Sequence, residues 1–250
     1  WIWLYEIPKK QKRLSQKEYD YIHSDADELI DPEQPVQKIS WNKLLGYRQT
    51  WALIAGKFLT DGVWWFYLFW LPKFLNAQFG LTKGDIALPV AVVYMISSVG
   101  SVFGGWLPLR LSNRGQEVFK ARKRSMMIYA FFALPVVAAQ LLGEYEMWFA
   151  VLIIGIAAAA HQAWSANIFT TASDMFPKRA VGSVTGIGGM AGALGGMLTA
   201  KIAGYLFDYY KNTGELQVGY MIMFMICGIA YLVAWSIMFS LIPKVEKVNI

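Results

Sequence analysis

The sequence predicts an all-α membrane protein built around a bundle of six transmembrane helices. Of its 250 residues, 56% are hydrophobic and only 16% are charged, well below the roughly 25% charged residues of soluble domains. The hydrophobic residues gather in blocks of about 20, the length that an α-helix needs to cross the roughly 30 Å hydrocarbon core of a bilayer. Most basic residues fall between alternate blocks. These three observations together predict the fold class.

The first element, residues 1–8, is predicted to be the end of a transmembrane helix. Trp1, Trp3 and Tyr5 are aromatic side chains of the kind found where a helix leaves the bilayer. No signal-peptide pattern is present. We therefore expect this chain to be a fragment of a longer transmembrane protein, whose preceding helices are missing.

Residues 9–49 form the only long polar stretch and are predicted to be a cytoplasmic loop that joins two membrane halves. Within it, Ser15 and Glu18 form a capping box, which predicts a short helix through His23. The prolines that follow, in Asp31–Pro32 and Gln34–Pro35, would end any helix there.

Residues 50–243 are predicted to be the six-helix bundle, and residues 244–250 a cytoplasmic tail. Aromatic residues at the ends of many spans are typical of the membrane–water interface. The six spans are Thr50–Leu75, Ala87–Leu107, Ser125–Leu142, Met147–Thr171, Gly182–Phe207 and Tyr220–Ile242.

The distribution of basic residues predicts the orientation of the bundle. Eighteen of the 23 Lys and Arg residues lie on the side of the residue 9–48 loop, and three lie in the opposite loops. Cytoplasmic loops carry such an excess of basic residues, so both ends of the bundle are predicted to be cytoplasmic. The net charge of +6 therefore reflects orientation and indicates no nucleic-acid partner.

A polar stripe on the fourth span is predicted to line a substrate cavity. His161, Trp164, Asn167 and Thr171 share one helical face. Polar side chains at this depth are costly unless they meet partners or a wet cavity. Hydrogen bonding between helices is the alternative interpretation.

The first span carries a second group of candidates. Lys57 and Asp61 are four residues apart and can pair, and Trp64 continues their face. Asp61 is a candidate for the site or a gate, although Lys57 could instead extend toward the cytoplasm. Tyr67 is a cavity candidate because its hydroxyl group needs a partner.

Small residues recur at every fourth position of the fifth span, which predicts close helix packing. The series runs through Gly188, Gly192, Gly196, Ala200 and Gly204. It fits static packing or sliding during a conformational cycle. Gly186–Gly189 also resembles a dinucleotide loop, but no strand precedes it.

An enzyme is not expected, because the spans contain no recognisable catalytic or metal-binding pattern. The chain has one cysteine, Cys227, and two histidines, with no HExxH or GxSxG motif. We expect no cofactor and no metal.

The chain resembles the major facilitator superfamily, and within it the anion:cation symporters, most closely the hexuronate transporters. The matching segments are Thr60–Lys73, Ala160–Asn167, and Ser173–Pro177 followed by Val181–Gly192. Asp174 belongs to the last of these and is a gating or packing candidate. The resemblance covers essentially the whole chain.

The resemblance implies helices seven to twelve of a twelve-helix transporter in the bacterial inner membrane. It implies uptake of a glucuronate- or galacturonate-like anion with a coupling proton. The main proton-titrating carboxylates and a substrate-binding arginine are then expected in the missing half. One departure is Leu109, which stands where the superfamily's cytoplasmic Gly-x-x-x-Asp-Arg motif has its aspartate. The alternatives are a transporter of a different solute, such as a sugar or phosphate, and a membrane scaffold that transports nothing.

Overall fold

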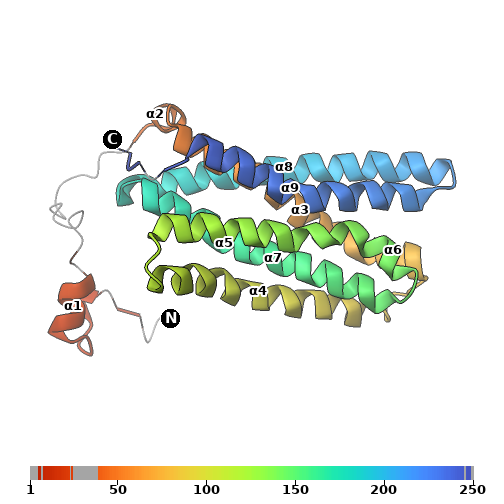
Figure 1. Ribbon diagram of the computed structural model, residues 1–250, viewed down its shortest axis with the longest axis horizontal. Coiled ribbons are helices and arrows are strands. Elements are labelled where there is room, and N and C mark those ends of the chain that lie inside the picture. Colours follow the sequence, from red (N-terminus) through yellow and green to blue (C-terminus); the bar gives the residue numbers. More distant parts are fainter. Residues whose placement is uncertain (1–4, 7, 23, 25–38, 245, 249–250) are drawn as a thin grey trace.

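A computed structural model describes residues 5–6, 8–22, 24, 39–244 and 246–248. These residues form helices and connecting turns, with no β-strand among them (Figure 1). Two short helices come first, η1 (Pro8–Lys10) and α1 (Gln16–Ile22), followed by α2 (Trp41–Leu45). The bundle consists of α3 (Arg48–Phe79), α4 (Ala87–Asn113), α5 (Val118–Ala133), η3 (Leu134–Ala138), α6 (Ala139–Gly143), α7 (Met147–Met175), α8 (Lys178–Asn212) and α9 (Leu216–Leu241).

The capping box before α1 is confirmed. The Ser15 hydroxyl donates to the Glu18 carboxylate at 2.7 Å, and the Glu18 backbone N–H donates back to Ser15 Oγ at 3.3 Å. The Ser15 backbone N–H also donates to the Glu18 carboxylate, at 3.0 Å, and the two hydrogen bonds that this carboxylate accepts from Ser15 lower the pKa of Glu18, because they stabilise its charged form. The helix ends at Ile22. His23, the Asp31–Pro32 and Gln34–Pro35 breaks, and most of the predicted helix end at residues 1–8 lie outside the described residues.

Each of the six predicted spans contains a long helical segment, and most of these extend beyond the predicted bounds. Five of them, among the described residues, are long and apolar enough to cross a membrane: α4, the α5–η3–α6 segment, α7, α8 and α9. The exception is α3, because its Lys57–Asp61 pair and several tryptophans lower its mean hydropathy. It nevertheless packs against α7, α8 and α9. Its crossing of the membrane stays a prediction.

The basic cluster between Arg110 and Arg124 lies largely on helices, whereas we expected a loop. α4 continues to Asn113 and α5 begins at Val118, so only a short turn separates them. Long basic side chains can extend from a helix end into the interface, which lets both helices continue past the apolar core.

The third predicted span is interrupted by a short 3₁₀ segment. This segment, η3, begins at Leu134 with Pro135 in its first turn, where proline lacks the N–H that the α-helical pattern needs.

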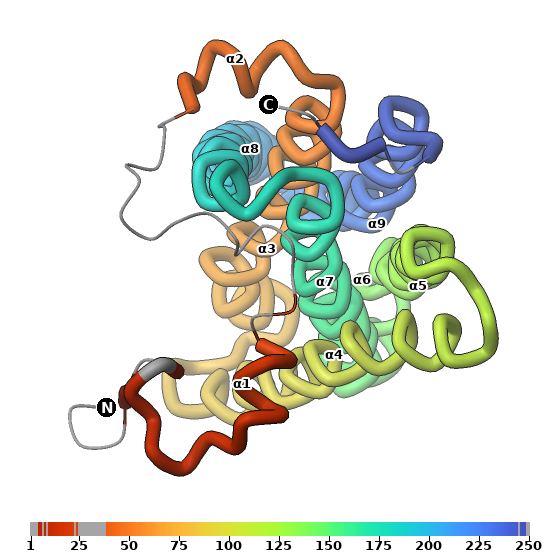
Figure 2. The backbone as a smooth tube through the Cα atoms, turned by 90° about the vertical axis from the view of Figure 1, so that its left-hand side faces the viewer, coloured from red at the N-terminus to blue at the C-terminus, as the bar shows by residue number. Residues whose placement is uncertain are grey.

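Two pairs of helices make the most extensive contacts in the bundle, α3 with α8 and α4 with α7 (Figure 2). We call these the α3–α8 seam and the α4–α7 seam. The helices of each pair run in the same direction, and their backbones approach closely at glycines. The remaining helices, α5 and α9, pack against each other and against α7 and α3, respectively. The bundle therefore consists of two glycine-lined seams joined by α9 and α5.

Candidate functional site

The centre of the α3–α8 seam holds an ion pair. Lys57 Nζ lies 2.7 Å from Asp61 Oδ2, with only 6% and 18% of the two side chains exposed. The Lys57 ammonium also lies 4.3 Å from the centre of the Phe169 ring on α7, a distance at which a cation is attracted to an aromatic face. The pair predicted from the four-residue spacing is therefore present, and it is enclosed by α7 as well as α8.

Glycines on α8 make room for this pair. A Cβ atom at Gly192 would overlap the Asp61 carboxylate, and one at Gly188 would lie 2.9 Å from Leu53 and 3.5 Å from Lys57 Cγ. At Gly196 the obstacle would be the Trp65 ring. Gly204, from the same predicted series, has nothing within 4 Å of its Cβ position. The close packing is thus concentrated beside the charged pair.

A second polar group lies at mid-depth, one helical turn from Asp61. The Trp64 and His161 rings stack with centroids 4.9 Å apart and planes 11° apart. His161 Nδ1 shares a 2.8 Å hydrogen bond with the Tyr231 hydroxyl of α9. His161 is the central residue of α7, and Trp64 is close to the middle of α3. Three helices therefore meet at this aromatic group.

The polar stripe on α7 lies inside the bundle. His161, Trp164, Asn167 and Thr171 are all 5% exposed or less. We expected this stripe to face an open cavity, but in this structure α4 and α5 pack against α7, and Tyr231 of α9 covers His161 and Trp164. Helical spacing shows which residues share a face but not what packs against that face. Contact between the stripe and a substrate stays a prediction.

Asn167 joins α7 to two other helices. Its Nδ2 donates to the backbone oxygens of Gly104 at 2.7 Å and Ala163 at 2.8 Å. Its Oδ1 accepts a 3.4 Å hydrogen bond from Arg122 on α5. Arg122 also forms an ion pair with Asp174, with Nε 2.9 Å from Oδ2. In this structure Asn167 and Asp174 therefore connect helices, and Thr171 donates back to the Asn167 carbonyl at 2.8 Å.

Four buried side-chain polar atoms have no hydrogen-bond partner within the described part of the chain, and two of them belong to predicted site residues. These two are the Tyr67 hydroxyl and Trp164 Nε1. Both side chains are 3% exposed or less. We expected the Tyr67 hydroxyl to find a partner in the cavity, and the structure shows no protein group in that position. Fully enclosed, Trp164 offers no free ring face in this conformation.

Some residues of this region were not identified from the sequence. Arg122 was considered only as part of the basic cluster Arg110–Arg124, as an anchor that sets orientation or as a latch onto acidic partners. Tyr231 lies in a uniformly apolar helix that gives no signal. Gly100 and Gly104 form the α4–α7 seam, where their Cβ positions would overlap the Ala159 backbone and approach Ala163 Cα at 2.8 Å, respectively. Their four-residue spacing is the same signal that we used for α8.

No group of three or more His, Cys, Asp or Glu among the described residues could hold a metal.

Comparison with known proteins shows that this chain is similar to membrane transport proteins. The family model described as Major Facilitator Superfamily matches residues 1–200. A hexuronate transporter of Escherichia coli strain K12 is 28% identical over 210 residues, which cover 83% of this chain and 48% of the relative. A D-galactonate transporter of Escherichia coli O6:H1 is 26% identical over 218 residues, covering 84% and 50%.

A match over a shorter segment is the voltage-gated purine nucleotide uniporter of Mus musculus, 27% identical over 178 residues, covering 71% of this chain and 39% of the relative. The chain spans about half the length of the two bacterial relatives.

Proposed function

This chain belongs to the major facilitator superfamily, and from that premise we propose that it forms one six-helix half of a secondary transporter for a small organic anion, with a hexuronate as the favoured substrate. The bacterial relatives are named as transporters of hexuronate and of D-galactonate, both sugar acids. Because those relatives are about twice as long, the working transporter would contain a second bundle that precedes this one in the same polypeptide. Transport would then proceed by alternating access around a site between the bundles.

The observation that carries this proposal is the Lys57–Asp61 pair at the centre of the α3–α8 seam. Ionisable side chains at this depth are expensive and usually mark a substrate or ion pathway. A substrate carboxylate can replace Asp61 as the partner of Lys57, which would keep the ammonium paired throughout. We therefore assign substrate recognition to Lys57 and an exchange or gating role to Asp61.

Trp64 is the aromatic residue best placed to contact the ring of a sugar acid. It is only partly buried, lies one turn from Asp61, and is held by its stack on His161. The Trp164 ring, which the sequence predicts to line the cavity, is fully enclosed and could not stack on a substrate in this conformation. His161, Trp164, Asn167 and Thr171 would contribute only in a conformation that opens the stripe on α7, and Tyr67 would contribute its unpartnered hydroxyl.

We further propose that transport is coupled to proton entry and that the protein resides in a bacterial inner membrane with both ends of this bundle cytoplasmic. The 18-to-3 division of basic residues supports this orientation. The main proton-titrating carboxylates are expected in the second bundle, so no residue of this chain is given that role. The partners are thus the organic anion, the coupling proton, the second bundle and the lipid bilayer.

Substrate binding to the full-length protein tests the proposal. D-Glucuronate and D-galacturonate should bind, whereas D-glucose, which has no carboxylate, should bind at least tenfold more weakly. Trp64→Ala should weaken glucuronate binding by about 5- to 150-fold, the loss expected when one contact to a desolvated ligand is removed. Trp106→Ala, on the exposed face of α4, is the matched control. Isothermal titration calorimetry measures both, and equal binding of glucose and glucuronate would contradict the proposal.

A further inference from the structure

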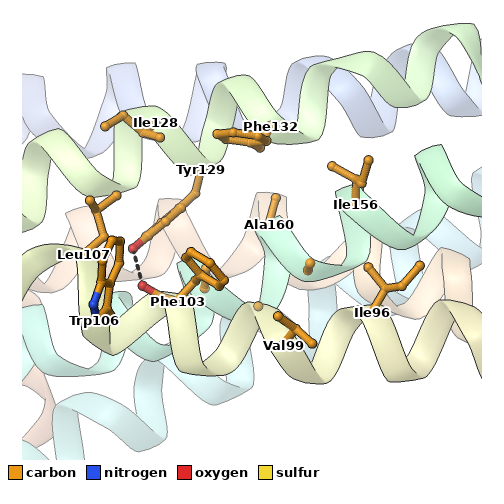
Figure 3. Close-up of a pocket in the computed structure, with 13 residues that line it drawn as sticks. Ile96, Val99, Phe103, Trp106, Leu107, Ile128, Tyr129, Phe132, Ile156 and Ala160 are labelled. Atoms are coloured by element: carbon orange, nitrogen blue, oxygen red, sulfur yellow. Dashed lines mark hydrogen bonds between the residues drawn. The ribbon is translucent and has the colours of Figure 1, made fainter.

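A groove on the outer surface of the bundle lies between α4, α5 and α7, away from the Lys57–Asp61 pair. Its volume is about 570 Å³. Figure 3 shows Trp106 and Leu107 at one end and Ile96 and Ile156 at the other, with Phe132 and Tyr129 along the α5 side. The floor consists of the small residues Ala159, Ala160 and Ala163 of α7. Small residues in the floor and large ones along the walls produce a long apolar trough.

The walls of this groove offer very few side-chain polar groups to a polar ligand. The lining residues are apolar except at Trp106 and Tyr129. The Tyr129 hydroxyl, which points along the groove toward α4, donates to the Phe103 carbonyl at 2.9 Å (Figure 3). A sugar acid placed here would leave its hydroxyl groups and carboxylate without partners, and burying unpaired polar groups is costly. The groove is therefore unsuited to the proposed substrate and suited to a hydrocarbon chain.

The length and position of the groove match one leaflet of a bilayer. Along α4 its lining runs from Ile96 to Leu107, which is about 16 Å at 1.5 Å per residue. Half of a hydrocarbon core is about 15 Å thick. Arg110 lies one turn beyond Leu107, at the basic end of the bundle, with its guanidinium carbon 4.9 Å from the centre of the Trp106 ring. Within the described part of the chain, no acidic side chain forms an ion pair with Arg110.

We propose that this groove binds one acyl chain of an anionic phospholipid from the leaflet at the basic end, with the lipid phosphate against Arg110. Trp106 would lie at the interface, as tryptophan does in membrane proteins, and would hold the guanidinium over its ring. Basic sites beside transmembrane helices on the cytoplasmic side are suited to anionic lipid head groups. The lipid would cover the exposed faces of Val99 and Phe103, which are 54% and 52% exposed.

Native mass spectrometry of the full-length protein tests this inference, with phosphatidylglycerol and phosphatidylethanolamine of identical acyl chains as probes. The wild-type protein should retain one phosphatidylglycerol in preference to phosphatidylethanolamine. Val99→Trp fills the groove and should reduce retention at least tenfold, whereas Met95→Trp, on the same helix outside the groove, should not. Arg110→Gln should reduce the preference for phosphatidylglycerol about fivefold, and Lys211→Gln, at the opposite end of the bundle, should leave it unchanged.

A second measurement does not depend on these variants. Phosphatidylglycerol with a photoreactive group in its acyl chain should cross-link to α4 and α7 peptides that line the groove of the wild-type protein. Equal retention of both lipids by the wild-type protein would overturn the head-group assignment. Cross-linking elsewhere, or a cross-link from a Val99→Cys variant to another helix of the full-length protein, would overturn the lipid site and show that protein fills the groove.

Discussion

The α3–α8 and α4–α7 seams both pack through glycines, but the groups that these glycines contact differ. In each seam, glycines four residues apart on one helix let the other helix approach closely, as small residues do in transmembrane helices. Gly100 and Gly104 of α4 lie against the backbone of α7 at Ala159 and Ala163. In the α3–α8 seam, Gly195 of α8 likewise lies against the α3 backbone at Phe58, but Gly188 and Gly192 lie against α3 side chains. Both seams therefore join backbones, and the α3–α8 seam also surrounds a group of side chains.

The polar groups of the two seams differ accordingly. The α4–α7 seam is closed by a neutral amide, Asn167, which donates to the Gly104 carbonyl. The α3–α8 seam instead holds a charged pair of two side chains, Lys57 and Asp61. We propose that the α4–α7 seam holds the bundle together and that the charged pair in the α3–α8 seam serves transport.

The largest expected effect on stability comes from breaking the charged pair. Lys57→Met removes one partner and leaves Asp61 charged and mostly buried, which costs about 3 kcal/mol of unfolding free energy. Denaturant titration of the full-length protein in mild detergent measures the loss. Lys73→Met, whose lysine is exposed near the other end of α3, is the control and should change the unfolding free energy little. An unfolding free energy equal to wild type in Lys57→Met would show that the pair is not enclosed as described.

A smaller loss is expected from the α4–α7 seam, where adjacent glycines provide a matched comparison. A Cβ atom at Gly104 would lie 2.8 Å from Ala163 Cα, whereas one at Gly105 would have nothing within 4 Å. Gly104→Ala should therefore lower the unfolding free energy by about 2 kcal/mol, and Gly105→Ala should not lower it. The same titration applies. Equal stability of the two variants would mean that the backbones of α4 and α7 do not approach closely.

The smallest effect on stability is expected at Gly192, combined with a clear effect on transport. Its Cβ would meet the Asp61 carboxylate, which can turn aside, so Gly192→Ala should cost about 1 kcal/mol. Shifting the Asp61 carboxylate while it stays paired with Lys57 should nevertheless reduce glucuronate uptake at least tenfold. The control is Gly189→Ala, because nothing lies within 4 Å of that position. Equal glucuronate uptake by Gly192→Ala and Gly189→Ala would contradict the proposal that the α3–α8 seam serves transport.

The sequence was sufficient to predict the helices and their order, because spans of about 20 apolar residues and the loops between them are local features. The Lys57–Asp61 pair and the packing of Gly188, Gly192 and Gly196 were also predictable, since each depends on spacing within one helix. The 3₁₀ segment at Pro135 had a visible signal that we did not use.

The orientation of the α7 stripe could not be predicted in the same way. In a transmembrane helix, both the lipid-facing and the core-facing positions are apolar, so the pattern that distinguishes inside from outside in soluble helices is lost. Nothing local to Asn167 shows that Gly104 and Arg122, 63 and 45 residues away, are its partners. The Trp64–His161–Tyr231 group likewise depends on three helices meeting.

The most direct test of the central claim, that the charged pair serves transport rather than stability, is a double variant. Lys57→Met/Asp61→Leu replaces both charges with apolar side chains, and such replacement of a buried pair is often neutral or stabilising. We predict that the double variant regains the unfolding free energy lost in Lys57→Met, while glucuronate uptake in proteoliposomes containing the full-length protein stays at the level of empty vesicles. Wild-type uptake by the stable double variant would contradict the claim and assign the pair to packing alone.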